Sequence, residues 1–476
     1  VRLRADDDAQ PTVGDVVEVR ALLRTPAPPV YPGAWDLQRD AFFAGLGAGG
    51  MALGPVTRIA PGVPSGPART LRALRDTIAA RILAGLPGSA GAIGATLLTG
   101  HTGAIPETDR AAFRDSGLAH LLAVAGLHVG IVLGLLLGAT RFLLARSAYA
   151  ALFWPCKQIA AITALAAGGA YLLLTGAHVP IMRSFAMATL FTLAVLTGRR
   201  AVSLRGLGIA AVVILLVAPW EVGGVSFQMS FSAVLALIAG YEALRGPLRR
   251  LQGDGATWRR LLSHIVALAL TSILAGTASA PFAAYHFGRV QSWFVLANLV
   301  AVPLTASWIM PWGLASLALM PLHLERLALV PMGWGIDAVL WVAHGVSDMP
   351  DAVWQVPHAP GWGLAVLSAG LAWLGIWRLR WRLAGLAAIA LGLASPLLDR
   401  PPDLLVSPDA RVIALRTPEG AYAEMAPGAG RFVRDSYAQY LAVPALRRLP
   451  ESGAVAEGRA VCAADGCRLR AAPDGP

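Results

Sequence analysis

The chain has 476 residues, of which 56% are hydrophobic and 14% charged, and its formal net charge is +11. Soluble globular domains carry about 25% charged residues, and the mean hydropathy here is +0.60. This composition excludes a soluble globular protein and indicates a polytopic α-helical membrane protein.

The net positive charge comes almost entirely from the apolar part of the chain. Residues 1–119 hold 12 arginines against 11 acidic residues, and residues 399–476 hold ten basic and ten acidic residues. Residues 120–398 hold 17 basic and 7 acidic residues. The excess is therefore better explained by orientation in a membrane than by a nucleic-acid footprint.

Residues 1–66 are predicted to form a small, β-rich soluble domain. Apolar and polar residues alternate over 14–24, which predicts a half-buried strand, and they do so weakly over 1–4. A second strand is expected at 51–60 and a short helix at 35–43.

Residues 67–117 are predicted to be a helical linker. The stretch 69–87 places four arginines among leucine and isoleucine residues, which favours a basic amphipathic helix on the membrane surface. The stretch 88–100 is apolar but too short to span a bilayer, so we expect a re-entrant or interfacial segment.

Residues 118–398 are predicted to be a membrane domain with about ten spans. A span needs about 20 apolar residues, and several of these segments are short or interrupted by Gly and Pro. Pro303 and Pro311 predict a broken helix in the seventh segment. The predicted spans are 118–140, 158–176, 180–197, 205–219, 227–241, 262–283, 293–319, 327–346, 361–377 and 383–397.

Basic residues lie in alternate loops of this region. One set of loops holds fifteen of them, including the pair Arg199–Arg200, whereas the intervening loops hold Arg183 and Arg289. The positive-inside rule makes the first set cytoplasmic. With ten spans, both soluble ends then lie outside the cytoplasm.

Two histidines, His120 and His128, lie in the first predicted span. An imidazole inside a bilayer is costly, so its default interpretation is functional. Eight residues apart on one helix, the two rings would lie about 80° apart. A polar stripe facing a pore is one interpretation, and a pair of interhelical hydrogen bonds is the structural alternative. Gly126 also allows close helix approach.

Three other segments place polar groups near the same predicted outer face. If these polar groups converge, they form the mouth of a pore. The alternative is that they lie there because a polar residue costs little free energy at the end of a membrane span. Asp337 and His344, seven residues apart on one helix face, indicate a relay or a buried pair. The pore candidates in the three segments are Arg183, Gln228, Ser230, His286, Asn298 and Pro303.

The tail, residues 399–476, is predicted to be a β-meander. Its strands are expected at Leu404–Ser407, Arg411–Arg416 and Ala421–Met425, separated by turn residues. Cys462 and Cys467 form a C-x4-C pair. Outside the cytoplasm this pair could be a disulfide, and two free thiols are the alternative.

Motifs for hydrolysis and metal binding are missing from the sequence. There is no H-x-H-x-D-H, H-E-x-x-H or G-x-S-x-G, and no G-x-x-x-x-G-K-[ST] for a nucleotide. We therefore expect no enzymatic activity, no metal and no cofactor.

The run His-Leu-Leu-Ala-Val-Ala-Gly-Leu-His-Val-Gly at 120–130 closely resembles the "HLLAISGLHV" signature of the ComEC family of competence proteins. The resemblance extends over nearly the whole chain, and the landmarks of the family occur here in the same order as in the family. Its other landmarks are Pro32–Asp36, Leu97–Gly100, Phe113–His120, Val179–Arg183, Phe227–Phe231 and Ala297–Pro303.

The resemblance implies an inner-membrane channel that admits single-stranded DNA during natural transformation. It implies that residues 1–66 are part of an OB-type domain, in which Arg20, Arg24 and Arg39 would guide the strand. It also implies a separate cytoplasmic ATPase or helicase, a DNA receptor and membrane lipid as partners, and it leaves a homo-oligomer open. A small-molecule permease and a membrane-bound hydrolase are the competing classes.

The chain departs from the family pattern in three ways. Ala125 stands where serine is common, and the front of the OB-type domain and the helices before it are not in this sequence. The family's β-lactamase-like domain is represented by residues 399–476, a degenerate fragment without the metal motif, so nuclease activity is not assigned. We therefore expect this chain, which begins at Val1, to be part of a longer protein.

Overall fold

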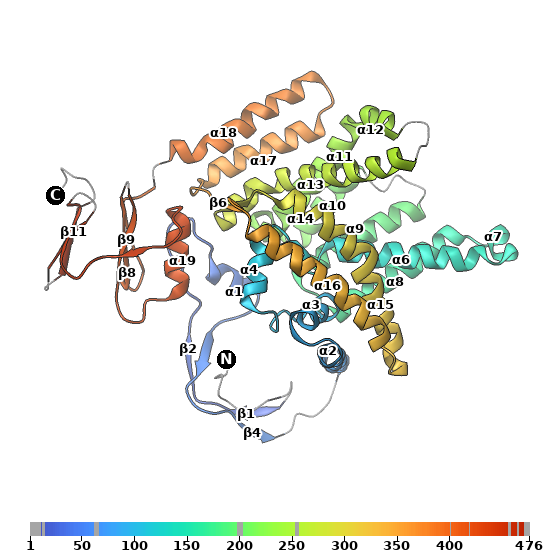
Figure 1. The fold of residues 1–476 in the computed structure, drawn as a ribbon, viewed down its shortest axis with the longest axis horizontal. Helices are drawn as coiled ribbons and strands as arrows, with labels where there is room; N and C mark the ends of the chain where they lie inside the picture. The colour runs from blue at the N-terminus through green and yellow to red at the C-terminus, as the bar shows by residue number, and fades with distance from the viewer. Residues whose placement is uncertain are drawn as a thin grey trace.

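The computed structural model describes residues 11, 15–60, 66–197, 203–252, 257–399, 401–417, 419–455, 458–463 and 466–470. Long helices form a bundle, and the strands of both chain ends lie to one side of it (Figure 1). The weak strand pattern at 1–4 and the pair Arg199–Arg200 lie outside the described residues.

Most helices of the bundle follow the apolar segments of the sequence. In chain order the helices of the bundle are α2 (Pro67–Gly85), α3 (Gly88–Thr99), α4 (Glu107–Asp115), α5 (Ala119–Leu122), α6 (Gly126–Ala145), α7 (Ala148–Phe153), α8 (Cys156–Leu174), α9 (Val179–Leu196), α10 (Leu204–Val217), α11 (Val225–Ala243), α12 (Arg245–Gln252), α13 (Thr257–Phe287), α14 (Phe294–Leu304), α15 (Met310–Leu319), α16 (Arg326–Ser347), α17 (Gly361–Ile376) and α18 (Ala384–Leu398). Of these, α4 and α12 are polar.

Each of the ten predicted spans overlaps at least one apolar helix. In the described part of the chain, seven are long and apolar enough to cross a membrane, and Pro180–Leu196, Leu204–Val217 and Gly361–Ile376 are shorter. The expected number of about ten is reached only if these three are included. The chain is a polytopic helical membrane protein on either count.

The first predicted span, 118–140, is not one helix. α5 ends at Leu122, and α6 begins at Gly126 after an extended Ala125. His120 and His128 therefore lie on different helices, and the predicted angle between them does not apply. Leu118 and Leu121 are buried in the apolar core around α3, whereas Val129 and Val132 of α6 are buried in a second core with Tyr171 and Ile181, so the two parts of the segment pack into different cores.

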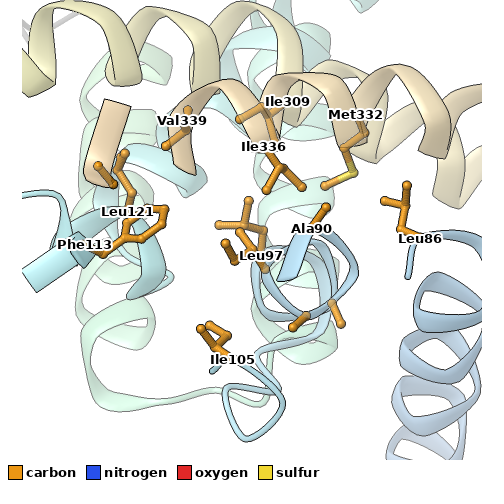
Figure 2. Packing of buried hydrophobic residues seen from close by; sticks show 14 of the residues in the cluster. Leu86, Ala90, Leu97, Ile105, Phe113, Leu121, Ile309, Met332, Ile336 and Val339 are labelled. Atoms are coloured by element: carbon orange, nitrogen blue, oxygen red, sulfur yellow. The ribbon is translucent and has the colours of Figure 1, made fainter. Parts of the chain in front are cut away.

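α3 lies at the centre of that core. Its residues from Ala90 to Thr99 are all buried, and it packs against α2 and α16. Figure 2 shows Ala90 and Leu97 beside Met332 and Ile336 of α16. A helix that is apolar on every side is stable when it is surrounded by protein, and α3 is so surrounded; its re-entrant or interfacial position relative to a membrane stays a prediction.

α2 is basic and amphipathic, as predicted, but it is held against the bundle. Ala79 and Ile82 are buried in the α3 core. Arg81 donates to the Glu325 carboxylate, just before α16, through Nε at 2.9 Å and Nη2 at 2.6 Å. The predicted linker 67–117 therefore contributes to the same core as α14 and α16.

The seventh segment contains a widened turn where a break was expected. α14 continues through a π-helical turn, Thr305–Ile309, directly into α15. Pro303 and Pro311 cannot donate a backbone hydrogen bond, and a wider turn accommodates this loss. The Ser307 hydroxyl donates to the Pro303 carbonyl oxygen at 2.7 Å. π-Helical turns occur frequently at functional sites.

The N-terminal strands form two separate ribbons. The segment predicted as one strand at 14–24 is two: β1 (Val16–Glu18) pairs with β4 (Thr57–Ala60), and β2 (Ala21–Arg24) pairs with β3 (Gly49–Ala52), both antiparallel. No pairing joins the two ribbons within the described ranges. A closed OB-type barrel therefore stays a prediction.

The predicted helix at 35–43 is confirmed as α1 (Leu37–Phe43). The Asp36 carboxylate accepts a hydrogen bond from the Arg39 backbone N–H at 3.0 Å. This cap satisfies one of the N–H groups that a helix leaves free at its first turn.

The predicted β-meander in the tail is confirmed. β7 (Leu404–Val406), β8 (Val412–Thr417) and β9 (Gly420–Met425) pair antiparallel in that order. Cys462 and Cys467 face each other across a hairpin and form a disulfide. The remaining elements of the tail are α19 (Arg431–Tyr440), β10 (Arg447–Arg448), β11 (Gly453–Val455), β12 (Ala460–Ala463) and β13 (Gly466–Leu469).

The two soluble ends of the chain share one hydrophobic core. Val30 is buried in the same cluster as Val412 and Tyr437, and Tyr31 packs against it. The Tyr437 hydroxyl donates to the Val30 carbonyl oxygen at 3.2 Å. We call the end of the bundle that faces these strands the strand end. A further ribbon, β5 (Arg289–Gln291) with β6 (Val353–Gln355), links the helices there.

Four glycines allow α17 and α18 to pack in direct backbone contact. A Cβ at Gly370 would lie 2.8 Å from the Gly385 carbonyl oxygen, and one at Gly392 would lie 2.6 Å from that of Gly363. Close approach through small residues is how helices associate in lipid, where no hydrophobic effect drives them together.

We predict that Gly392→Ala destabilises the protein, because the added methyl group overlaps a backbone atom and overpacking costs about 1–3 kcal/mol. Gly134→Ala in α6 is the control, since nothing lies within 4 Å of a Cβ added there. The control should keep or raise stability, because Ala is the better helix former. Melting temperatures of the detergent-solubilised variants, followed by tryptophan fluorescence, test this, and equal losses for both variants would contradict it.

Candidate functional site

A buried arginine organises the polar side chains at the strand end. Arg183, in the second turn of α9, is 7% exposed. Its Nη2 donates to the hydroxyls of Ser226 at 2.5 Å and Ser230 at 3.3 Å. The two serines are four residues apart on α11, so they share a helix face. The Glu221 carboxylate lies 3.8 Å from Nη1.

The turn Pro219–Gly223 brings Glu221 to this position. α10 ends at Val217, and the short 3-10 turn reverses the chain before α11 begins at Val225. A distance of 3.8 Å is too long for a hydrogen bond, and Arg183 Nη1 is buried with no hydrogen-bond partner among the described residues. A buried cation without full partners is costly, and the Glu221 carboxylate is the anion nearest to Nη1 within the described residues.

Gln228 and His286 extend this network toward the soluble ends. His286, at the end of α13, is hydrogen-bonded through Nε2 to Gln228 Oε1 at 2.8 Å. Gln228 Nε2 donates to the Val222 carbonyl oxygen at 3.0 Å. α11, α13 and the turn before α11 are thereby joined. We call Arg183, Glu221, Ser226, Ser230, Gln228 and His286 the mouth network.

α1 reaches the mouth network from the N-terminal domain. Arg39 donates through Nη2 to the Trp220 carbonyl oxygen at 3.1 Å, and Phe43 stacks on the Trp220 ring with centroids 4.4 Å apart. Of the three predicted DNA-guiding arginines, the structure brings Arg39 alone to this place. Arg24 lies on the exposed strand β2, and Arg20 lies just before it.

His128 lies on α6, which packs against α9, but among the described residues it makes no hydrogen bond to the mouth network. It is fully buried in the first turn of α6; Nδ1 accepts a distant hydrogen bond from the Ala125 backbone N–H at 3.5 Å, and Nε2 has no partner in the described chain. Gly126 lies against Ser184, the residue after Arg183, because a Cβ there would be 3.4 Å from the Ser184 hydroxyl oxygen. Gly126 thus allows α6 to approach α9.

The remaining candidates are separate from this network. His120 is exposed on α5, with Nδ1 3.1 Å from the Gly117 carbonyl oxygen. Asn298, on α14, has a buried Oδ1 with no partner in the described ranges, and Pro303 is half-buried before the π-helical turn. His344 pairs with Asp109 of α4 at 2.8 Å rather than with Asp337, because α4 packs across α16.

Sequence reasoning missed Glu221 and Ser226. Glu221 is the first acidic residue after Asp115 and lies within a long apolar stretch, which is a signal that could have identified it. Ser226 shares a helix face with Ser230, but its partner on α9 is 43 residues away. In the described part of the chain, no cluster of three His, Cys, Asp or Glu residues could hold a metal ion.

Comparisons with known proteins identify the family of the chain. ComE operon protein 3 of Bacillus subtilis is 25% identical over 246 residues, which are 50% of this chain and 28% of that protein. Competence protein ComA of Neisseria gonorrhoeae is 32% identical over 292 residues, 54% of this chain and 41% of its own length. The uncharacterized protein YcaI of Escherichia coli is 26% identical over 317 residues, 62% of this chain and 38% of its own length.

The chain spans less than half the length of each of these relatives, and no solved structure matches it. The family described as competence protein matches residues 97–381, which is more than half of the chain and includes all of the mouth network. The chain therefore belongs to the competence protein family.

Proposed function

We propose that the chain forms a channel in the inner (plasma) membrane that passes single-stranded DNA into the cytoplasm during natural transformation. The observation that carries this proposal is the mouth network, in which Arg183 is buried at the strand end with an unused N–H donor. A DNA strand is a polyanion, and crossing an apolar layer requires donors that replace the water around its phosphates.

The neighbours of Arg183 suit transient binding of a phosphate. Ser226 and Ser230 hold the guanidinium in place and leave Nη1 for the ligand. Glu221, at 3.8 Å, offsets part of the positive charge. Conduction requires binding that is strong enough for entry and weak enough for release, and a cation with an acidic neighbour meets both conditions.

The distribution of charge supports an orientation with both soluble ends outside the cytoplasm. α7, α12 and the turn between α17 and α18 lie away from the strands in Figure 1. These are the places where Arg146 and Lys157, Arg249 and Arg250, and Arg380 occur. Basic loops are retained on the cytoplasmic side, so the mouth network would face outward.

The proposed channel needs partners, because the sequence contains no ATP-binding motif. We propose that a separate cytoplasmic ATPase or helicase supplies the energy and that an external receptor delivers DNA to the strand end. The chain itself is proposed to act without enzymatic activity.

Arg183→Gln, placed in the chromosomal gene, should reduce transformant counts by roughly ten-fold or more, since a hydrogen bond to a charged group contributes about 1.5–3 kcal/mol. Arg289→Gln is the matched control. Arg289 is also at the strand end, but it pairs with Asp115 at 3.1 Å, outside the mouth network. Protein abundance, DNA outside the inner membrane and transformant counts are measured together.

Arg183→Gln at normal abundance should leave DNA accumulating outside the membrane, whereas the control should transform normally. Normal counts for Arg183→Gln would remove the mouth network from the mechanism. Normal counts in a strain that lacks the whole gene would reject the channel function.

The orientation predicts the behaviour of reporter fusions. Alkaline phosphatase fused after α18 should be active because it reaches the outside, and green fluorescent protein fused there should be dark. The reverse is expected for fusions after α11, at Leu244, because the basic helix α12 follows directly. A fluorescent fusion after α18 would overturn the layout.

A further inference from the structure

Six aromatic and imidazole rings contact one another in an unbroken series that begins next to the mouth network. Trp35 contacts His286 edge-on, with ring centroids 5.9 Å apart, and His286 contacts Tyr285 at 4.9 Å. Tyr285 contacts His358 at 5.9 Å, and His358 contacts Tyr440 at 4.7 Å. The sixth ring, Tyr31, lies 4.2 Å from Tyr440 and 5.8 Å from His358. We call these six residues the ring cluster.

The ring cluster connects four parts of the chain that are distant in sequence. Tyr31 and Trp35 precede α1, Tyr285 and His286 lie in the last turn of α13, His358 precedes α17, and Tyr440 ends α19. His286 belongs to both the ring cluster and the mouth network, through its hydrogen bond to Gln228. The rings therefore lead from the shared core of the soluble ends to the mouth network.

The rings remain accessible although they touch one another. Trp35 is 46% exposed, and the other five are half-buried. All six of these contacts are tilted or edge-to-face, and such contacts leave ring faces uncovered. Tyr31 and Tyr440 also pack against the shared core of the soluble ends, so of the Trp and Tyr rings of the cluster, Trp35 and Tyr285 lie outside that core.

The cluster also stays uncharged at neutral pH where it meets the soluble ends. Burial lowers the pKa of the His358 imidazole, against a smaller opposing effect of Asp399. Burial, together with the neighbouring Tyr440 and Tyr285, raises the pKa of the Tyr31 hydroxyl to about 12. Flat, uncharged rings can stack on other flat rings.

We propose that the ring cluster is a stacking platform for the unpaired bases of a DNA strand as it approaches the mouth network. This inference rests on the proposed function. Base stacking on aromatic side chains tolerates any sequence, because every base has a π face. In a duplex these faces are covered by neighbouring base pairs, so the platform selects the single strand, whereas a phosphate contact does not.

Binding measurements with two polymers separate stacking from attraction to phosphate. The full chain, in detergent, is titrated into a labelled oligothymidylate and into an abasic deoxyribose-phosphate polymer of the same length. Trp35→Leu and Tyr285→Leu should weaken binding of the oligothymidylate by roughly five-fold or more, the size expected for one stacked base. They should leave binding of the abasic polymer unchanged.

Trp354→Leu is the matched control. Trp354 is 63% exposed on β6, beside the same end of the bundle, and it makes none of the ring contacts of the cluster. Trp35→Phe keeps a ring and should retain most of the affinity, which separates loss of stacking from loss of folding. The Trp354 control should bind both polymers as the unsubstituted chain does.

Two outcomes would overturn the proposal. Equal affinity of the unsubstituted chain for both polymers would mean that bases are not recognised. Equal weakening of both polymers in Trp35→Leu, with a lower melting temperature, would mean that the rings only hold the soluble ends to the bundle. Neither result depends on transformant counts, so failure of this inference is distinct from failure of the channel function.

Discussion

The guanidinium of Arg183 imposes the strictest requirement on the strand end of the bundle. A buried cation among apolar helices persists only where oxygen atoms surround it. Two serines of α11 and a glutamate of the turn before it provide these atoms. α9, α11 and the turn Pro219–Gly223 must therefore meet at one point, and the hydrogen bond from Gln228 to His286 adds the end of α13.

Small residues determine how closely the helices around this point approach each other. α3 is buried over ten consecutive residues because its alanines and glycines allow neighbours on all sides. Gly126 lets α6 lie against Ser184, next to Arg183. The glycines of α17 and α18 join the last two helices by direct backbone contact. Since lipid provides no hydrophobic driving force, such packing is the main source of helix association.

The soluble ends are built as one unit rather than two. Val30 fills a core whose other members come from β7, β8, β9 and α19, and the rings of Tyr31 and Tyr440 are in contact. This unit contacts the bundle beside the mouth network, through Arg39 on the Trp220 carbonyl and Gln439 on the His286 carbonyl. The soluble ends are therefore held next to the residues that surround Arg183.

The sequence by itself determined the class of protein, the positions of the apolar helices, helix α1 and the meander of the tail, because these depend on local composition and periodicity. It also identified Arg183, Gln228, Ser230 and His286 as polar residues in apolar surroundings.

Tertiary structure alone decided that these four, with Glu221 and Ser226, form one network, since their partners lie up to 58 residues apart. It likewise decided that α3 is central and that His120 and His128 lie on separate helices, because the residues on either side of the break pack into two different cores. Local patterns report which face of a segment is apolar, but they do not report which other segment covers it.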